Sequence, residues 1–283
     1  MSWDIERHAA ELERDGYTIL ERVLPQDEID SSVAAIEETL ASEETIGRKY
    51  GLQSANLRMV FNAQAKHRHF HGLPLRYPAP IEVARRVLGN DMFAHDVTIR
   101  VPMPTGEKDH KRFGGNLHAD WSDFTVKPFV GGRHYALGIQ AAWALTEFST
   151  TTGGPVVWPG SHLTNEIPPE DSVSLPPGWK IAEAPAGSVL MWDASLWHTG
   201  GTNRGDGPRY SLILFFQRWW VKGFNDSYRY MPPEMRAQMS LEERKLWGQE
   251  AGVPPNTHFR GMSQEQIEAL TPEEQAVLNI AAY

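Results

Sequence analysis

The stretch His118-Ala119-Asp120, taken together with the later His198, decides what this chain can fold into. A histidine and a carboxylate two residues apart point to the same face of a β-strand, because strand side chains alternate with a period of two. Such a pair can occupy adjacent positions on one metal ion, and a histidine on a neighbouring strand can supply a third ligand. Two imidazoles and one carboxylate on one face of an octahedron leave three positions open, as non-haem Fe(II) oxygenases require.

A turn-forming run, Thr199 to Pro208, follows His198 and leads into a strand-like sequence from Arg209 to Phe216. If this run closes a hairpin, Arg209 returns opposite His198 or one residue off, with cross-strand Cβ atoms about 5 Å apart. A guanidinium at that place can hold a carboxylate through two parallel hydrogen bonds. The pattern therefore predicts a metal ion and an anchored dicarboxylic acid in one pocket.

An isolated His-x-Asp pair carries little information, so the surrounding segments matter. Residues 13–25 contain Glu-Arg-Asp-Gly-Tyr and Val-Leu-Pro, and residues 153–162 read Gly-Gly-Pro-Val-Val-Trp-Pro-Gly-Ser-His. Together with the 118–120 pair, His198 and an arginine eleven residues later, these segments resemble, in the same order, the phytanoyl-CoA dioxygenase family of Fe(II)- and 2-oxoglutarate-dependent oxygenases. The resemblance spans roughly residues 10 to 220, and the combination is far more specific than any one part.

The resemblance implies a mainly β fold with flanking helices, a cupin-like double-stranded β-helix or jelly roll. It implies that His118, Asp120 and His198 are the catalytic, Fe(II)-binding residues, and that Arg209 holds 2-oxoglutarate. Ser211 has the same strand parity as Arg209 and is a candidate helper. Oxidation of a small organic substrate by O2, by default hydroxylation, would release succinate and CO2; desaturation or ring closure would use the same residues.

Residues 135–145 form an apolar run that predicts a buried strand carrying Gln140 and Trp143. Either side chain could face the pocket and contact the cofactor, although each is also an ordinary core residue. Ala119 and Leu117 depart from the Gln and Trp frequent at these positions of the family. Because the three expected metal ligands are intact, these departures affect which substrate is expected and leave the expected reaction unchanged.

Two other classes of function stay open from the residues alone. One is a cupin-like metalloenzyme that does not use 2-oxoglutarate, such as an isomerase or hydrolase with Zn or Mn. The other is a catalytically silent binding protein on the same fold. The spacing of Arg209 after His198 argues against the first class, and the intact ligand set argues against the second.

Composition limits the remaining possibilities. The 283 residues fit a single domain with its core at about 10–220 and a helical C-terminal extension at about 221–283. The absence of cysteine excludes disulfides and thiolate sites and fits a reducing cytoplasm. A net charge of −9 gives no electrostatic footprint for nucleic acid, and no apolar run suggests a membrane span or signal peptide. We expect a cytoplasmic monomer or homodimer acting on a small molecule.

The segment 104–134 is long and polar and lies next to both early ligands. Trp121, Phe124 and Phe129 offer apolar surface there, so we expect a substrate-covering loop in preference to a solvated connection. Leaving out Asp120, its five basic residues exceed its three acidic ones, which favours a substrate with an anionic group: Lys108, Lys111, Arg112, Lys127 and Arg133 against Glu107, Asp109 and Asp123.

The other histidines are assigned structural roles. His67, His69 and His71 alternate without a nearby carboxylate, which favours a loop or helix edge with solvated imidazoles over a zinc site. His162, in the Pro-Gly-Ser-His turn, is expected to make a turn-fixing hydrogen bond. Helices are expected at 3–15, 26–42, 81–89, 233–249 and 263–281, and strands at 17–23, 93–101, 135–145, 189–193 and 195–198.

Overall fold

The structure is a computed structural model that describes residues 3–105, 116–120, 129–130, 132–164, 166–169, 176–223, 227–248, 269–271 and 273–274. Its centre is an antiparallel six-stranded sheet in the order β1-β9-β6-β11-β3-β2. The strands of this sheet are β1 (Tyr17–Leu20), β2 (Leu57–Val60), β3 (Phe93–Pro102), β6 (Gly138–Ala144), β9 (Val189–Asp193) and β11 (Ser211–Gln217).

A second, three-stranded sheet in the order β10-β7-β8 packs against one face of the first. Its strands are short: β7 (Val156–Val157), β8 (Lys180–Ile181) and β10 (His198–Thr199). A separate hairpin joins β4 (Phe129–Val130) to β5 (Arg133–His134). Two antiparallel sheets placed face to face, with helices outside, form the jelly-roll core that the sequence predicts.

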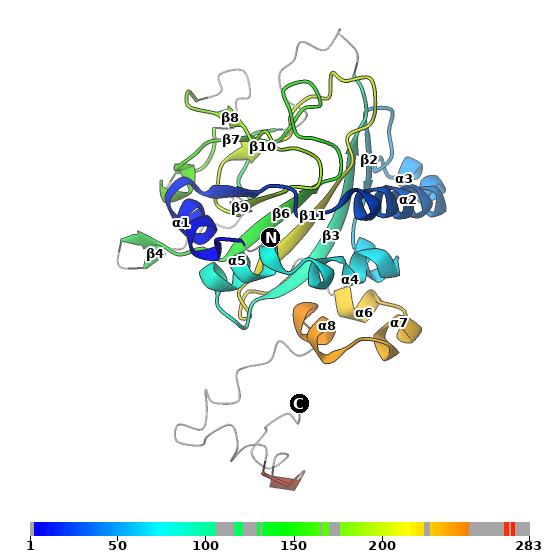
Figure 1. Ribbon diagram of the computed structural model, residues 1–283, viewed down its shortest axis with the longest axis vertical. Coiled ribbons are helices and arrows are strands. Elements are labelled where there is room, and N and C mark those ends of the chain that lie inside the picture. The colour runs from blue at the N-terminus through cyan, green and yellow to red at the C-terminus, as the bar shows by residue number, and fades with distance from the viewer. Residues whose placement is uncertain are drawn as a thin grey trace.

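Helices cover the other face of the main sheet. In Figure 1 the helices α4 and α5 lie below the sheet, whereas the three short strands lie above it. The helices are α1 (Ile5–Asp15), α2 (Gln26–Ser42), α3 (Glu44–Lys49), α4 (Arg68–Arg76), α5 (Ala79–Leu88), α6 (Ser227–Tyr230), α7 (Pro233–Ala237) and α8 (Leu241–Leu246), with 3₁₀ turns η1 (Ala63–Ala65) and η2 (Ser161–Leu163).

Local sequence explains the ends of these helices. Asp4 caps α1 by accepting a hydrogen bond from the Arg7 backbone N–H, and Gly16 ends it in the left-handed conformation with φ 82°. Gly89 likewise follows α5, and α2 spans the predicted 26–42. The helices α1, α2 and α5 and the strands β1 and β3 thus lie close to their predicted places, whereas α3, β2 and α4 were not predicted.

Strand alternation separates the side chains of the main sheet into two sets. Ile139, Trp143 and Leu214 belong to the core beneath the helices, together with side chains of α2, α4 and α5. Ala142, Ile213 and Trp192 belong to a second core that faces the short strands. The space between the two sheets, where the predicted metal ligands lie, is thus separated from the helix side by one layer of backbone.

The predicted hairpin between His198 and Arg209 is wrong. His198 lies in β10, which pairs with β7, whereas β11 pairs with β3 and β6 in the other sheet. The turn-forming residues between them therefore carry the chain from one sheet to the other. This crossing is tertiary, so local pairing rules could not reveal it.

The prediction that the histidines at 67–71 are solvated is wrong for His71 and for His69, whose Nε2 lies 2.8 Å from the Ser32 hydroxyl. His67 is the N-cap of α4, but His71 is fully buried, with its ring 5.6 Å from that of Trp247. The Trp247 indole N–H donates to the His71 carbonyl at 3.2 Å, which ties the end of α8 to α4. His162 behaves as predicted, since its Nε2–H donates to the Glu13 carbonyl at 3.2 Å.

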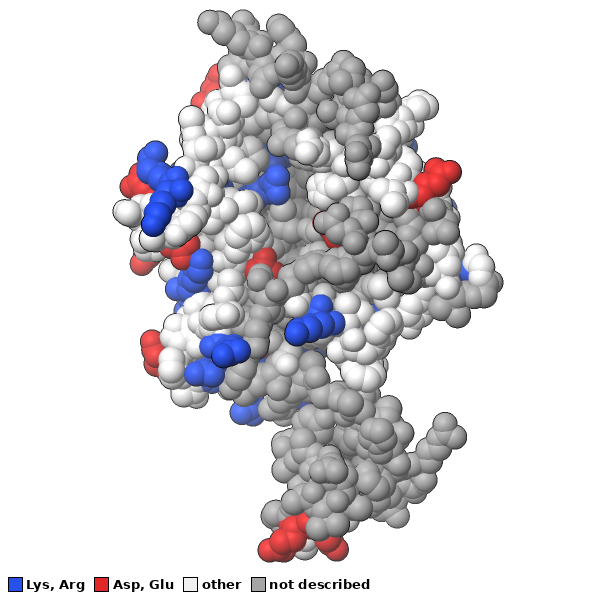
Figure 2. Space-filling view, turned by 180° about the vertical axis from the view of Figure 1, so that it is seen from behind, with Lys and Arg blue, Asp and Glu red and all other residues white. Residues whose placement is uncertain are grey.

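The C-terminal extension begins with the short helices α6 to α8, and most of the predicted helix 263–281 lies outside the described residues. Within the described part of the chain, no helix is long and apolar enough to cross a membrane. On the face shown in Figure 2, basic and acidic side chains are interspersed, and its described residues form no continuous basic patch.

Candidate metal centre

Reciprocal backbone hydrogen bonds bring the predicted ligands together. His118 and His198 form an antiparallel bridge, with N···O distances of 3.0 and 2.8 Å, and their ring centroids are 4.3 Å apart. The Asp120 backbone N–H donates at 2.8 Å to the carbonyl of Ala194, in the turn that follows β9. One turn, residues 193–198, therefore places His198 and also holds the segment that carries the other two side chains.

The three side chains converge on one point. Asp120 Oδ1 lies 3.9 Å from His118 Nε2 and 3.7 Å from His198 Nε2. All three ligand atoms lie within 4.8 Å of one another. These separations are too long for hydrogen bonds. Two nitrogen or oxygen ligands at about 2.1 Å from one metal lie about 3 to 4.2 Å apart, so the observed spacing suits a shared ion.

Backbone carbonyls fix the tautomers of both imidazoles. His118 Nδ1–H donates to Asn116 O at 2.8 Å, and His198 Nδ1–H donates to Leu196 O at 2.9 Å. A carbonyl can only accept, so each Nδ1 carries the proton and each Nε2 keeps its lone pair. Metal-binding histidines are oriented in this way, through a hydrogen bond from the nitrogen that does not bind the metal.

Burial shapes the electrostatics of the centre. It raises the pKa of Asp120 to about 6 and lowers the pKa of His198 to about 4. Gln140 and Trp192 approach Asp120 closely enough to oppose the rise, yet Asp120 Oδ2 has no hydrogen-bond partner among the described residues. A buried carboxyl group with an unsatisfied oxygen beside two neutral imidazoles fits a divalent cation, whose charge would offset the cost of burial.

Arg209 is buried to 3% exposure and lies where the two sheets meet. Its Nη1–H donates to the Gly153 carbonyl, while its Nε has no hydrogen-bond partner in the described chain. Burial, and to a lesser extent the positive charge of Arg100, lower the pKa of Arg209 to about 9. Gly153 has φ 76° and touches the Thr202 backbone, so only glycine fits the position that presents this carbonyl.

Ser211 faces the same side as Arg209, as its parity predicts, but its hydroxyl is engaged. The Ser211 Oγ–H donates to the Arg100 carbonyl at 2.9 Å. In this arrangement Ser211 has no proton to offer a ligand, and it can only accept a hydrogen bond.

Arg100 is a site residue that the sequence analysis missed. It lies opposite Ser211 in the β3–β11 register, and it acts electrostatically on His118, His198 and Arg209. Burial lowers its pKa, and the charge of Asp120 opposes this. Among described residues, no carboxylate lies within ion-pair distance of it. The available signal was an arginine within a mostly buried strand, β3, two residues before its end.

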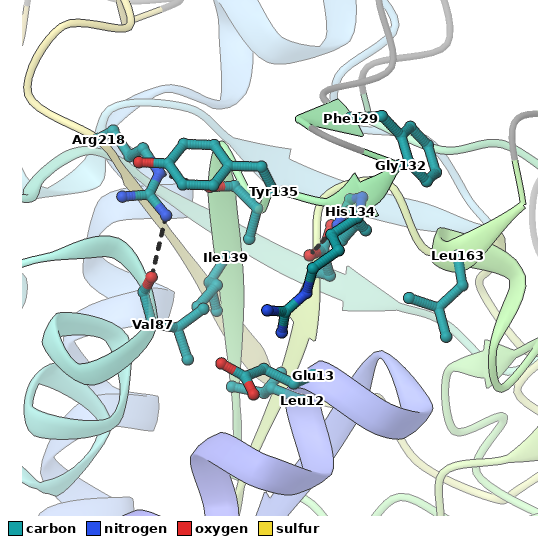
Figure 3. A pocket seen from close by; sticks show the side chains of 13 residues that line it. Leu12, Glu13, Val87, Phe129, Gly132, His134, Tyr135, Ile139, Leu163 and Arg218 are labelled. Carbon is teal, nitrogen blue, oxygen red and sulfur yellow. Dashed lines mark hydrogen bonds and ion pairs between the residues drawn. The ribbon is translucent and has the colours of Figure 1, made fainter.

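The other candidate residues fall in different places. Gln140 lies on the face toward the short strands, near Asp120, as proposed. The expectation that Trp143 could face the pocket is wrong. Its side chain belongs to the hydrophobic core on the helix side of β6, because side chains alternate between the two faces of a strand. Phe129 lines a separate cavity beneath α1, shown in Figure 3, while Trp121 and Phe124 lie outside the described residues.

Residues 12–211 match the sequence profile of the phytanoyl-CoA dioxygenase family. The chain belongs to this family. Membership agrees with the predicted resemblance, with the jelly-roll core and with the three-residue metal centre. As a member of the phytanoyl-CoA dioxygenase family, the protein is a non-haem iron oxygenase that uses 2-oxoglutarate and O2.

Several relatives in the phytanoyl-CoA dioxygenase family have curated names. The chain is 23% identical to dioxygenase af480 of Aspergillus fumigatus over 254 residues, which cover 87% of this chain and 77% of the relative. It is 29% identical to the ectoine dioxygenase of Streptomyces anulatus, with coverage of 72% and 75%. Both alignments extend over most of each protein.

Solved structures share the fold. HygX from Streptomyces hygroscopicus, crystallised with nickel and 2-oxoglutarate, superposes with a TM-score of 0.60 at 15% identity, over 77% of this chain and 89% of that one. The epimerase SnoN, in complex with Fe3+, alpha ketoglutarate and nogalamycin RO, gives a TM-score of 0.58 at 22% identity, with coverage of 76% and 83%. At this identity the likeness supports the fold alone.

Proposed function

We propose that His118, Asp120 and His198 hold the Fe(II) of this oxygenase. The observation that carries the proposal is the convergence of three ligand atoms within 4.8 Å, with both imidazoles presenting Nε2 and one carboxylate oxygen left unbonded. Bound iron would couple the decarboxylation of 2-oxoglutarate, to succinate and CO2, with oxidation of a substrate C–H bond by O2. The three residues would hold one side of the ion and leave the other side to the reactants.

Arg209 is the proposed anchor for the distal carboxylate of 2-oxoglutarate. A buried guanidinium is stable only when its donors are matched, and among the described residues this one has a single backbone partner and an unpaired Nε–H. The aromatic ring of Phe148 lies 5.3 Å from its Cζ and keeps the side chain in place. A carboxylate would complete its hydrogen bonds and neutralise its charge.

Arg100 is the proposed contact for an anionic group of the substrate. Counting formal charges, Fe(II), Arg209 and Arg100 exceed Asp120 and 2-oxoglutarate by one positive charge, which a substrate carboxylate would balance. This agrees with the basic excess of the segment 104–134. The substrate we propose is a small organic acid with an apolar body, and hydroxylation is the proposed outcome.

The test is a screen of small organic acids and their amides with Fe(II) and 2-oxoglutarate, in which succinate above the substrate-free background is measured. An acid should stimulate succinate release more than its amide. Arg100→Gln should raise the KM for the acid about 10- to 100-fold, because it removes a charged hydrogen bond, and should change the KM for 2-oxoglutarate less. Equal stimulation by acid and amide would contradict the substrate class, and a metal-dependent reaction without succinate would contradict the proposed chemistry.

We also propose the compartment, the oligomeric state and the domain organisation of the enzyme, on the grounds of composition and length. The lack of cysteine suits a reducing compartment, so we place the enzyme in the cytoplasm. We propose that it acts as a monomer or homodimer, without nucleic acid or membrane partners, and that residues 1–283 form one domain with a C-terminal extension.

A further inference from the structure

A second histidine–aspartate pair lies behind the metal centre. Asp193 is the last residue of β9 and pairs with Ile139, so its side chain lies on the helix side of the main sheet. Its Oδ2 is 2.8 Å from His134 Nε2, and Asp193 is only 4% exposed. Both residues line a cavity of about 520 Å³ beneath α1 and the β4–β5 hairpin, where Figure 3 shows His134 and the dashed line to its partner.

Asp193 is bonded to the turn that carries the metal centre. Its Oδ1 accepts from the Ser195 N–H at 2.8 Å, and its carbonyl accepts from the Leu196 N–H at 2.8 Å. In the same turn the Ala194 carbonyl holds the Asp120 backbone, and the Leu196 carbonyl holds the His198 ring. The Asp193 side chain therefore fixes the turn whose carbonyls orient two of the three proposed ligands.

His134 is itself held in place from the other side. Its ring meets the ring of His162 edge-on, with centroids 5.3 Å apart and an interplanar angle of 90°. The His162 Nε2–H bonds to the Glu13 carbonyl near the end of α1. The imidazole that hydrogen-bonds to Asp193 thus packs on a histidine that is bonded to α1, and the turn cannot shift without breaking buried contacts.

We propose that His134 and Asp193 are positioning residues for the metal ligands. They do not bind the ion, because Asp193 points to the opposite side of the sheet from Trp192, which faces Asp120. They act by keeping the Ala194 and Leu196 carbonyls where Asp120 and His198 need them. The inference rests on the proposed metal centre. Substituting partners that orient metal ligands typically weakens metal binding about 10- to 100-fold.

The experiment measures Co(II) binding to the metal-free full-length protein by calorimetry, together with the visible absorption spectrum of the Co(II) form. Asp193→Asn and His134→Leu should weaken Co(II) binding about 10- to 100-fold and alter the spectrum. His134→Gln keeps a donor for the carboxylate, so it should restore most of the affinity. This rescue separates positioning from general packing.

A matched control is Glu37→Gln. Glu37 is part of a bidentate ion pair with Arg58 and accepts from Tyr210, far along the chain from the turn. It should lower the Tm of the metal-free protein without changing the affinity for Co(II). Unchanged affinity in both Asp193→Asn and His134→Leu, or an equal loss in Glu37→Gln, would overturn the inference. Failure of the wild type to bind Co(II), or full binding by His198→Ala, would instead refute the metal centre itself.

Discussion

Two histidine–aspartate clusters lie on opposite sides of the end of β9, and they differ in the distance between the carboxylate oxygen and the imidazole nitrogen. In the first, Asp120 stays 3.7 and 3.9 Å from two imidazole nitrogens, with an oxygen left unbonded. In the second, Asp193 closes to 2.8 Å on His134 and also accepts a backbone N–H. The residue types are the same, but the first cluster is held open by backbone bonds to both of its chain segments.

The difference shows how a metal site can be told from a structural pair. A pair that is free to move closes to hydrogen-bond distance, since a buried polar atom without a partner is costly. Ligands that are held apart by their backbone keep the space for an ion. The same contrast separates two arginines: within the described part of the chain, Arg218 donates to three backbone carbonyls and stacks 3.7 Å from the Tyr135 ring centroid, whereas Arg209 donates to one.

The largest expected effect comes from breaking the first cluster. Replacing His118, Asp120 or His198 by Ala should abolish metal binding and succinate release while preserving the fold, because backbone hydrogen bonds hold the segments that carry these side chains. Calorimetry with Co(II), a succinate assay and circular dichroism would measure the three quantities. Asp193→Asn serves as the comparison and should retain measurable turnover. Full activity of the His198 variant would refute the assignment.

The two arginines give the next prediction. Arg209→Lys should raise the KM for 2-oxoglutarate about 10- to 100-fold, since losing one charged hydrogen bond costs about 1.5–3 kcal/mol. Arg218→Lys should leave that KM unchanged and lower the Tm, because Arg218 donates to the carbonyls of Val87, Leu88 and Ala136, away from the metal centre. Steady-state kinetics and thermal melts would compare them. An unchanged KM for Arg209→Lys would mean that another residue holds the cosubstrate.

The pH dependence of metal binding sharpens the comparison further. Burial raises the pKa of Asp120 to about 6 and lowers that of His198 to about 4. Above pH 6 the carboxylate is free to bind the ion. Below pH 6 a proton competes for it, so affinity for Co(II) should fall about tenfold for each pH unit down to about pH 4. His198 stays neutral over most of this window because its pKa is about 4, and burial lowers the pKa of His118 as well. A pH-independent affinity between 4 and 6 would contradict this.

The smallest effects are expected from substitutions on β6, and they should differ between its two faces. Trp143→Phe removes volume from the helix-side core and should cost about 1–3 kcal/mol of unfolding free energy, which corresponds to about 2–4 °C in Tm per kcal/mol. Its turnover should match the wild type. Gln140→Leu, on the other face, should change Co(II) affinity or kcat a few-fold with little effect on Tm. A large loss of turnover in Trp143→Phe would show that the two faces are coupled.

The sequence by itself determined the family, the jelly-roll class and the identity of the candidate ligands. It also determined α2, the end of α5 at Gly89 and the buried strand β6, because periodicity and capping are local. The spacing of His118 and Asp120, the position of His198 and the arginine at 209 were sufficient to define the candidate site. The sequence indicated Gln140 and Trp143 as residues that could face the pocket, without choosing between them.

Only the tertiary structure decided how these parts meet. His198 and Arg209 belong to different sheets, so no local turn rule could place them. Trp143 and Gln140 are close in sequence, and which of them faced the metal depended on which side of β6 the helices covered. Arg100 and the pair of His134 with Asp193 became visible only once strands distant in sequence had aligned. Sequence periodicity fixes which residues share a face, but long-range packing fixes what that face meets.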